Sequence, residues 1–162
     1  MSSAAGADPP ILGVDIGTFE AKAVLVTADG SVLARASRRH ELLTPRQGHV
    51  EHDPEVVWWD GLCAVAHELM NRPEASGGLR AVAVSGIGPC VLPVDEHLRP
   101  LRSAILYGVD VRAGRQVEAL SVRLGRDEIF RRSGNWLSSQ SAGPKIAWLR
   151  EEEPEVWESA RW

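Results

Sequence analysis

The sequence predicts an α/β layer fold, and two observations carry this prediction. Short β-branched or aliphatic runs separated by turn signals occupy residues 11–16, 22–28 and 31–37, a pattern typical of a three-stranded meander. Later in the chain, apolar runs of strand length alternate with segments whose apolar residues recur at helical spacing. A meander followed by alternating strands and helices favours a sheet covered by helices. One domain is the default for 162 residues.

The first helix is predicted after a long loop. Asp29 and Gly30 connect the second and third strands, and this pair suits a type I′ turn. Residues 38–55 contain Pro and Gly without a sustained period, so we expect a crossing loop there. At its end Asp53 can cap a helix that begins at Pro54. Apolar side chains then recur at helical spacing at Trp58, Leu62, Val65 and Leu69.

The second half of the chain mixes short strands with helices. Residues 79–86 form a compact apolar run, residues 90–101 are typical of a strand followed by a turn, and residues 104–107 form another short strand. A helix follows from Asp110 and ends near Gly125, a residue type common after the last helical turn. Further helices are expected near residues 127–132, at 141–152 and from about 155.

Composition excludes several classes of function. With 18 Lys plus Arg against 22 Asp plus Glu, the formal net charge of -4 provides no cationic field for nucleic acid. The cysteines, Cys63 and Cys90, form neither a disulfide framework nor a metal-spaced pair, which favours an intracellular, cytoplasmic protein. No apolar run approaches the roughly 20 residues of a membrane helix, so no membrane association is expected. We expect residues 1–10 to be a flexible leader.

The end of the first predicted strand carries the clearest chemistry. A carboxylate such as Asp15 can hold Mg²⁺ through water, and Gly17 lets the backbone approach a phosphate. Thr18 adds a hydroxyl, and Lys22 can add a point charge. The alternative is a polar turn in which Asp15 bonds its own backbone. The residues alone leave both interpretations open.

Five stretches occur in an order that carries a family resemblance. They are "GVDIGTFEAKAVLVTADGSVLA", "GHVEHDPEVVW", "AVAVSG", "RPLRSAILYGVDVRA" and "GNWLSSQSAGPKIAWLREEEPEVW". Together they cover residues 11–158 and resemble the amino-terminal part of the FGGY carbohydrate kinases, members of the actin, sugar kinase and heat-shock ATPase superfamily. The resemblance implies that residues 11–162 are part of an amino-terminal lobe. That lobe would be ribonuclease-H-like, with a mixed sheet flanked by helices, and incomplete.

The resemblance also implies roles for the first motif. Asp15 matches the acidic residue associated with Mg²⁺ and the transferred phosphate, and Gly17 and Thr18 match the phosphate-facing turn. The implied cofactor is ATP with Mg²⁺. Many relatives have hydroxyl residues where this chain has Phe19 and Glu20, which removes a hydroxyl near the phosphates.

Substrate contacts are implied farther along the chain. Asp110 and Arg112 match the acidic and basic residues of a "W.D.R" type motif near the sugar, with Tyr107 in place of tryptophan. Carboxylates accept hydroxyl hydrogen bonds, and an aromatic face can lie against sugar C–H groups. Asp110 as a helix N-cap is an alternative that does not exclude sugar contact.

The region around Gly88 limits what can be said about the substrate. Residues 86–89, Gly-Ile-Gly-Pro, stand where glycerol kinases usually have Gln-Arg-Glu and xylulokinases Gln-Met-His. Gly88 is therefore expected to contribute a small, backbone-lined wall to a sugar or polyol site. The sequence therefore assigns neither glycerol nor xylulose as the substrate.

The resemblance implies transfer of the γ-phosphoryl group of ATP to a sugar hydroxyl, which needs the phosphate turn, a metal and a base together. The base aspartate and the second phosphate motif are expected beyond Trp162, so we predict no catalytic base within this chain and no activity of the chain alone. Elements that cover the sheet would be absent as well. The chain is therefore expected to expose apolar surface. Either it associates, for example as a homo-oligomer, or it is the ordered portion of something longer.

Other readings stay open. A non-catalytic nucleotide- or sugar-binding module would keep the same fold and the phosphate turn. A ribonuclease-H-like nuclease would combine Asp15 with Asp95 and Asp110 around two metals, although the acidic net charge disfavours its substrate. His49 and His52 suit turn bonding and capping better than metal binding. Separately, Lys145 either lies near the site or begins a helix, and most of the six tryptophans suit packing.

Overall fold

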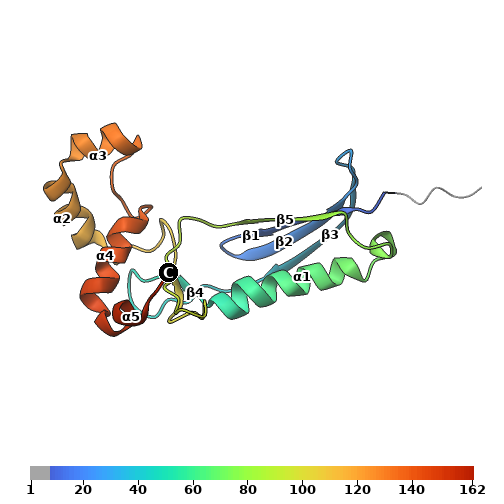
Figure 1. The fold of residues 1–162 in the computed structure, drawn as a ribbon, viewed down its shortest axis with the longest axis horizontal. Coiled ribbons are helices and arrows are strands. Elements are labelled where there is room, and N and C mark those ends of the chain that lie inside the picture. The colour runs from blue at the N-terminus through green and yellow to red at the C-terminus, as the bar shows by residue number, and fades with distance from the viewer. Residues whose placement is uncertain (1–7) are drawn as a thin grey trace, which may run out of the picture. The chain divides into compact units, whose positions relative to one another are not determined.

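The computed structural model describes residues 8–162. The chain forms two compact units: the first comprises the chain up to Glu41 together with Glu55–Gly86, and the second comprises Leu42–Pro54 and Ile87–Trp162. In Figure 1 the first unit contains the large sheet and one long helix, and the second contains most of the helices. Among the described residues, no helix combines the length and the apolar content that crossing a membrane requires.

The first unit is built on a mixed four-stranded sheet. Its strands are β1 (Ile11–Ile16), β2 (Glu20–Val26), β3 (Val32–Arg39) and β5 (Ala81–Gly86). The order is β3-β2-β1-β5, with β1 and β2 antiparallel and β5 parallel to β1. The predicted meander is therefore confirmed, although β2 begins and ends two residues earlier than the predicted run 22–28.

Helix α1 covers one face of this sheet (Figure 1). The helical segment begins at Pro54, as predicted, with a π-helical turn over Pro54–Trp59, and continues as α1 (Asp60–Met70). Val65 and Leu69 of α1 are 1% and 0% exposed. Burying each of these side chains contributes roughly 1.5–3 kcal/mol. They pack in one cluster with the sheet residues Leu12, Val14, Ala21, Ala23, Leu25 and Ala36.

The turn between β2 and β3 differs from the predicted type I′ turn. Gly30 has a φ of 89°, but Asp29 is not among the residues with positive φ. The N–H of Gly30 donates to Thr27 O at 3.0 Å, and the Asp29 carboxylate accepts the N–H of Ser31 at 3.0 Å. Because a type I′ turn needs positive φ at both central residues, the type I′ prediction is wrong. The geometry suits a three-residue loop with glycine in the left-handed position.

Strand β5 presents its side chains to solvent. All six of its residues are exposed. Val82 and Val84, which pair with Leu12 and Val14 of β1, are 58% and 57% exposed. The first unit therefore has an apolar strip along one side of its sheet, in contrast to the buried side chains of β1 and β2.

The second unit contains a small two-stranded sheet. β4 (Glu51–His52) pairs antiparallel with β6 (Ala104–Ile105). The strand predicted within residues 90–101 is wrong, because that segment forms only isolated bridges, such as Val91 with Ile105. Proline at positions 93 and 100 explains the difference, since it cannot donate a ladder hydrogen bond.

Four helices complete the second unit: α2 (Gly114–Leu124), α3 (Arg126–Ser133), α4 (Ala142–Glu152) and α5 (Pro154–Ser159). α2 begins four residues after Asp110, and its N-cap position is Ala113 without a side-chain bond. The helix predicted between Asp110 and Gly125 is therefore confirmed with a later start, and the alternative of Asp110 as its N-cap is wrong. The core of the unit consists of Val91, Ile105, Ala113, Trp148 and Leu149.

Candidate functional site

The predicted phosphate residues lie at one end of the sheet in the first unit. Asp15 is the fifth residue of β1, and its register partners are Lys22 on β2 and Ser85 on β5. Leu12 and Val14 of β1 are buried in the cluster shared with α1. Because side chains alternate along a strand, Asp15, Lys22 and Ser85 share the opposite, open face. Sequence reasoning and strand register therefore agree on bringing Asp15 and Lys22 together.

A tight turn connects β1 to β2. The N–H of Gly17 donates to Glu20 O at 2.9 Å. A Cβ at position 17 would lie 3.0 Å from that same oxygen, so the close approach favours glycine. His40, the residue after β3, supports the turn, with its Nε2 at 3.1 Å from Gly17 O and its backbone N–H donating to Phe19 O. The turn is held by backbone contacts that leave its outer surface open.

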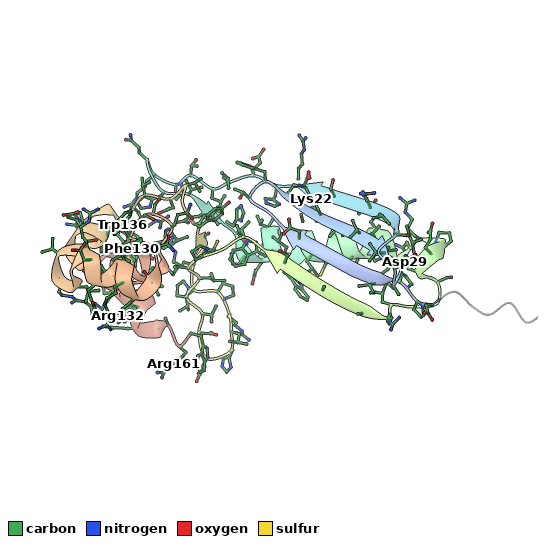
Figure 2. The ribbon with its side chains drawn as sticks, turned by 90° about the horizontal axis from the view of Figure 1, so that it is seen from above. Lys22, Asp29, Phe130, Arg132, Trp136 and Arg161 are labelled. Carbon is green, nitrogen blue, oxygen red and sulfur yellow. The ribbon has the colours of Figure 1, made fainter. Side chains whose placement is uncertain are left out.

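A hollow of ≈ 800 Å³ lies over this turn. Its lining combines loop backbone with charged side chains: Gly17, Thr18, Phe19, Glu20, Lys22, Arg39, His40 and Glu41. Three of the four predicted phosphate residues thus line one hollow. Asp15 instead lines a second, smaller hollow of ≈ 360 Å³ over the open face of the sheet, and Lys22 lines both. Figure 2 shows Lys22 and Asp29 toward opposite ends of the sheet.

The charges of the hollow are mixed. Lys22 Nζ lies 3.6 Å from the Glu20 carboxylate, and the Lys22 side chain is 63% exposed. An ion pair at this exposure is worth about 1 kcal/mol or less, so a stronger anion can displace it. Sequence reasoning missed Arg39 and His40 at the end of β3. The signal for Arg39 was its position in the β2–β3 hairpin, because the register of the two strands pairs Arg39 with Glu20.

Asp15 fits a role as a single metal-bridging carboxylate. Its side chain is exposed, and no described residue donates a hydrogen bond or forms an ion pair with it. Mg²⁺ commonly keeps several waters and uses one or two protein carboxylates together with substrate phosphates. Within residues 8–162, no group of three or more His, Cys, Asp or Glu side chains could hold a metal ion by itself.

The nuclease reading needs such a carboxylate cluster. Asp95 accepts the N–H groups of His97 and Arg99 at 2.8 Å, and these bonds hold the pKa of its carboxyl below the usual value. Asp110 is bound to Arg112. Neither carboxylate joins a metal-binding group in the part of the chain that the structure describes.

The predicted sugar residues belong to the second unit, where Asp110 is fully buried. Its Oδ2 accepts the N–H of Val50 at 2.7 Å and Arg112 Nη2 at 2.7 Å. Its Oδ1 accepts the backbone N–H of Arg112 at 3.1 Å. The carboxylate thus closes a local turn and fixes segment 47–54 at the same time. It accepts charge-assisted bonds, which are stronger than neutral ones.

Arg112 extends this contact into a buried network. Its Nη2 also donates to Glu51 at 2.7 Å, and Glu51 bonds Arg102, which in turn donates to Glu153 at 2.7 Å. The Arg112 side chain is 0% exposed. Its guanidinium carbon lies 4.9 Å from the ring centroid of Trp148, a cation–π distance. Arg112 Nη1 is buried and has no hydrogen-bond partner among the described residues.

His49 lies beside this network. Its ring packs edge-on against Trp148, with the centroids 5.7 Å apart. Burial lowers the pKa of His49, and the positive charge of Arg112 lowers it further. The imidazole therefore has an aromatic packing role here.

The other predicted substrate residues are more accessible. Tyr107 is half-buried and Gly88 is exposed, with open space where a Cβ would be. Gly108 has a φ of 57°, and its N–H donates to Ser139 O at 3.0 Å. The structure brings Asp110 and Arg112 into direct contact. Contact of a sugar with the four predicted substrate residues stays a prediction; these residues are Gly88, Tyr107, Asp110 and Arg112.

Lys145 lies in the first turn of α4 and has a buried side chain. It is 1% exposed, and its Nζ donates to Ser139 O. Burial lowers the pKa of Lys145, while the charge of Asp110 acts in the opposite direction. The residue that sequence reasoning left undecided is thus a buried cation near Asp110.

Comparison with known proteins places these features in a family. A model of the FGGY family of carbohydrate kinases, N-terminal domain, matches residues 10–162. The chain is 32% identical over 148 residues to a xylulose kinase of Lactococcus lactis, covering 91% of this chain and 29% of that protein. It is 34% identical over 142 residues to a glycerol kinase of Methylorubrum extorquens, covering 84% of this chain and 27% of that protein.

A solved structure supports the same assignment. The xylulose kinase of Rhodospirillum rubrum superposes with a TM-score of 0.86 at 32% identity, covering 93% of this chain and 31% of that one. The predicted α/β fold class, a ribonuclease-H-like lobe of the actin and sugar kinase type, is confirmed by this neighbour. The chain spans less than a third of the length of these relatives. The match over residues 10–162 shows that the chain belongs to the FGGY family of carbohydrate kinases and carries its N-terminal domain.

Proposed function

We propose that this chain is the phosphate-turn domain of an ATP-dependent carbohydrate kinase. The full-length protein would transfer the γ-phosphoryl group of ATP to a hydroxyl of a sugar or polyol. The observation that carries the proposal is the hollow at the β1–β2 turn, which Gly17, Thr18 and Lys22 line together. Turn amides and a lysine are the groups that commonly cradle phosphates.

Each residue of the turn has a defined part in this proposal. Gly17 permits the tight turn, because a side chain there would approach Glu20 O too closely. The absence of a side chain also lets a phosphate approach the backbone. Lys22 supplies positive charge once an anion displaces its exposed pairing with Glu20. Asp15, without an ion-pair partner among the described residues, would bind Mg²⁺ through water and so align the metal with the phosphates. A bound Mg²⁺ neutralises phosphate charge during transfer.

The second unit is proposed to hold the sugar side. Tyr107 and Gly88 are accessible, so the aromatic ring and the small glycine wall would touch the sugar or polyol. Asp110 and Arg112 have their contacts inside the protein, apart from the unpartnered Arg112 Nη1. Their contact with a sugar would therefore run through that one nitrogen or through a rearranged pair.

Several further properties belong to the same proposal. Residues 11–162 would form part of one lobe, the base aspartate would lie outside this chain, and the protein would work in the cytoplasm. The predicted flexible leader, residues 1–10, lies mostly outside the described residues. The predicted homo-oligomer rests on the exposed Val82 and Val84 of β5.

A second candidate is a non-catalytic nucleotide- or sugar-binding module. The Glu20 carboxylate favours it, because this negative charge lines the hollow where phosphates would bind. Such a module would bind ATP weakly, and no sugar would make the full-length protein form ADP.

The experiment has two parts. Titration of the 162-residue chain with ATP and Mg²⁺, followed by amide NMR, is expected to shift the resonances of Gly17 and Thr18, and the Asp15→Asn variant is expected to lose the Mg²⁺ dependence of the shift. The polypeptide translated from the native reading frame is then assayed for ADP formation with a panel of sugars and polyols. Sugar-dependent ADP formation supports the kinase, whereas ATP binding without turnover on the whole panel favours the module.

A further inference from the structure

The hollow over the β1–β2 turn contains one cation to which no role has been given. Arg39 is the last residue of β3, and its register partner is Glu20 of β2. It lines the hollow together with Gly17, Thr18 and Lys22. The question is whether its guanidinium is directed to the same ligand as the lysine.

Strand alternation places Arg39 on the open face of the sheet. Its neighbour Arg38 lies on the opposite face, because Arg38 Nη1 donates to Asp60 O at the start of α1, at 3.3 Å. Ala36 is buried in the cluster shared with α1 and therefore also lies on that face. Arg39 and Lys22 thus share the face away from α1, on either side of Glu20.

The guanidinium of Arg39 is available for a ligand. It makes no hydrogen bond or ion pair with any residue from 8 to 162. Lys22, by contrast, is paired with Glu20 at 3.6 Å. His40 is engaged through its ring with Gly17 O. Arginine presents a planar fork that matches phosphate oxygens in a bidentate arrangement, so an exposed, unpaired arginine beside turn amides suits a polyphosphate.

We propose that Arg39 is a phosphate-contacting residue, which binds the polyphosphate of the nucleotide from β3 while Lys22 binds it from β2, and that Glu20 between them weakens this binding. This inference rests on the proposed function of the turn and deepens it. Glu20 opposes binding in two ways, since it occupies Lys22 and places a negative charge beside the anion. The affinity of the site for phosphates would then depend on the balance of these three side chains.

The test uses inorganic tripolyphosphate as the probe and the isotopically labelled 162-residue chain. Dissociation constants come from the amide shifts of Gly17 and Thr18. Arg39→Gln is expected to weaken binding roughly fivefold, because an exposed charge-assisted contact is lost. Arg39→Lys is expected to recover part of the affinity, since the charge returns without the fork. Glu20→Gln is expected to tighten binding.

Arg35→Gln is the matched control. Arg35 lies on the same strand and the same face, pairs with Val24 and does not line the hollow. Arg35 lies four residues from Arg39, about 13 Å along the strand. Arg35→Gln removes the same charge as Arg39→Gln. Its affinity for tripolyphosphate is expected to stay close to that of the parent chain. All three substituted positions are solvent-exposed or half-buried, and thermal melting checks that each variant folds.

The outcomes separate this inference from the proposed function. Shifts at Gly17 and Thr18 with equal affinities for Arg39→Gln and Arg35→Gln would overturn the role of Arg39 and leave the phosphate turn intact. Tripolyphosphate that leaves both amides unshifted in the parent chain would overturn the proposed turn, and the role of Arg39 with it. Selective weakening by Arg39→Gln with tightening by Glu20→Gln supports the inference.

Discussion

The two units of this chain use similar charged residues in opposite ways. At the β1–β2 turn, Lys22 and Glu20 form one exposed pair, and Arg39 and Asp15 have no ion-pair partner among the described residues. In the second unit, the Arg112 side chain is 0% exposed and the Glu51 side chain 9%. Buried charges must be satisfied inside the protein, whereas exposed ones stay available to a ligand. Burial therefore separates structural charges from candidate binding charges.

The largest expected effect breaks the buried network. Asp110→Ala would leave the buried Arg112 with Glu51 as its remaining carboxylate partner and would remove the acceptor of the Val50 N–H, which is expected to cost about 3–5 kcal/mol of unfolding free energy. Residue-resolved amide hydrogen exchange would show this loss in the helices of the second unit. Asp15→Ala, which removes an exposed carboxylate, serves as the control and is expected to leave the stability of the first unit nearly unchanged. Equal effects of the two substitutions would contradict the distinction between the regions.

The next largest expected effect concerns phosphate binding at the β1–β2 turn. Lys22→Gln is expected to weaken tripolyphosphate binding by the chain roughly tenfold, because a charge-assisted contact is lost. The same substitution is expected to change thermal stability very little, since the Lys22 side chain is 63% exposed. Calorimetric titration measures the affinity. Unchanged affinity would remove Lys22 from the site.

These contrasts also show what the sequence could predict. Asp15, Gly17 and Lys22 were predicted together because they lie within eight residues, and local order is visible in a sequence. Arg39 was missed because its place depends on the register of a hairpin whose turn type was misassigned.

The second unit was harder to predict for a related reason. Asp110 precedes a periodic helix, so it resembled an N-cap. Its actual partners include the Val50 N–H, 60 positions earlier in the chain. Burial and long-range pairing of this kind leave no local pattern.

A pH-dependent effect follows from the chain's two lysines. Burial lowers the pKa of Lys145 from 10.5 in the folded state, so the unfolded chain binds more protons between the two pKa values. Unfolding free energy is therefore expected to rise as the pH increases through that window toward 10.5, where the cost of burying the charge disappears. Lys145→Met is expected to remove this rise when urea unfolding is repeated across the window.

Lys22→Met is the control for that measurement, because it removes the exposed lysine of the first unit. Its pH profile is expected to follow the parent chain. Burial raises the pKa of the Cys90 thiol, which titrates in a similar range and acts in the opposite direction, so the comparison is made between variants that all retain Cys90. A parent profile that matches Lys145→Met would show that the pKa of Lys145 is not lowered in the folded state, and would contradict the prediction.

The smallest expected effect tests, within the second unit, whether burial decides how much an ion pair contributes to stability. Arg115 bonds Glu152 between α2 and α4, but the Arg115 side chain is 77% exposed. Arg102 bonds Glu153 and Glu51 and is only 11% exposed. Arg115→Gln is expected to cost roughly 0.5 kcal/mol or less. Arg102→Gln is expected to cost several times more, because it removes the arginine that bonds Glu153 and one of the two arginines that bond Glu51. Urea unfolding of the two variants gives the comparison. Both substitutions remove one arginine from the same unit, so equal costs would mean that the number of ion pairs, and not their burial, sets its stability.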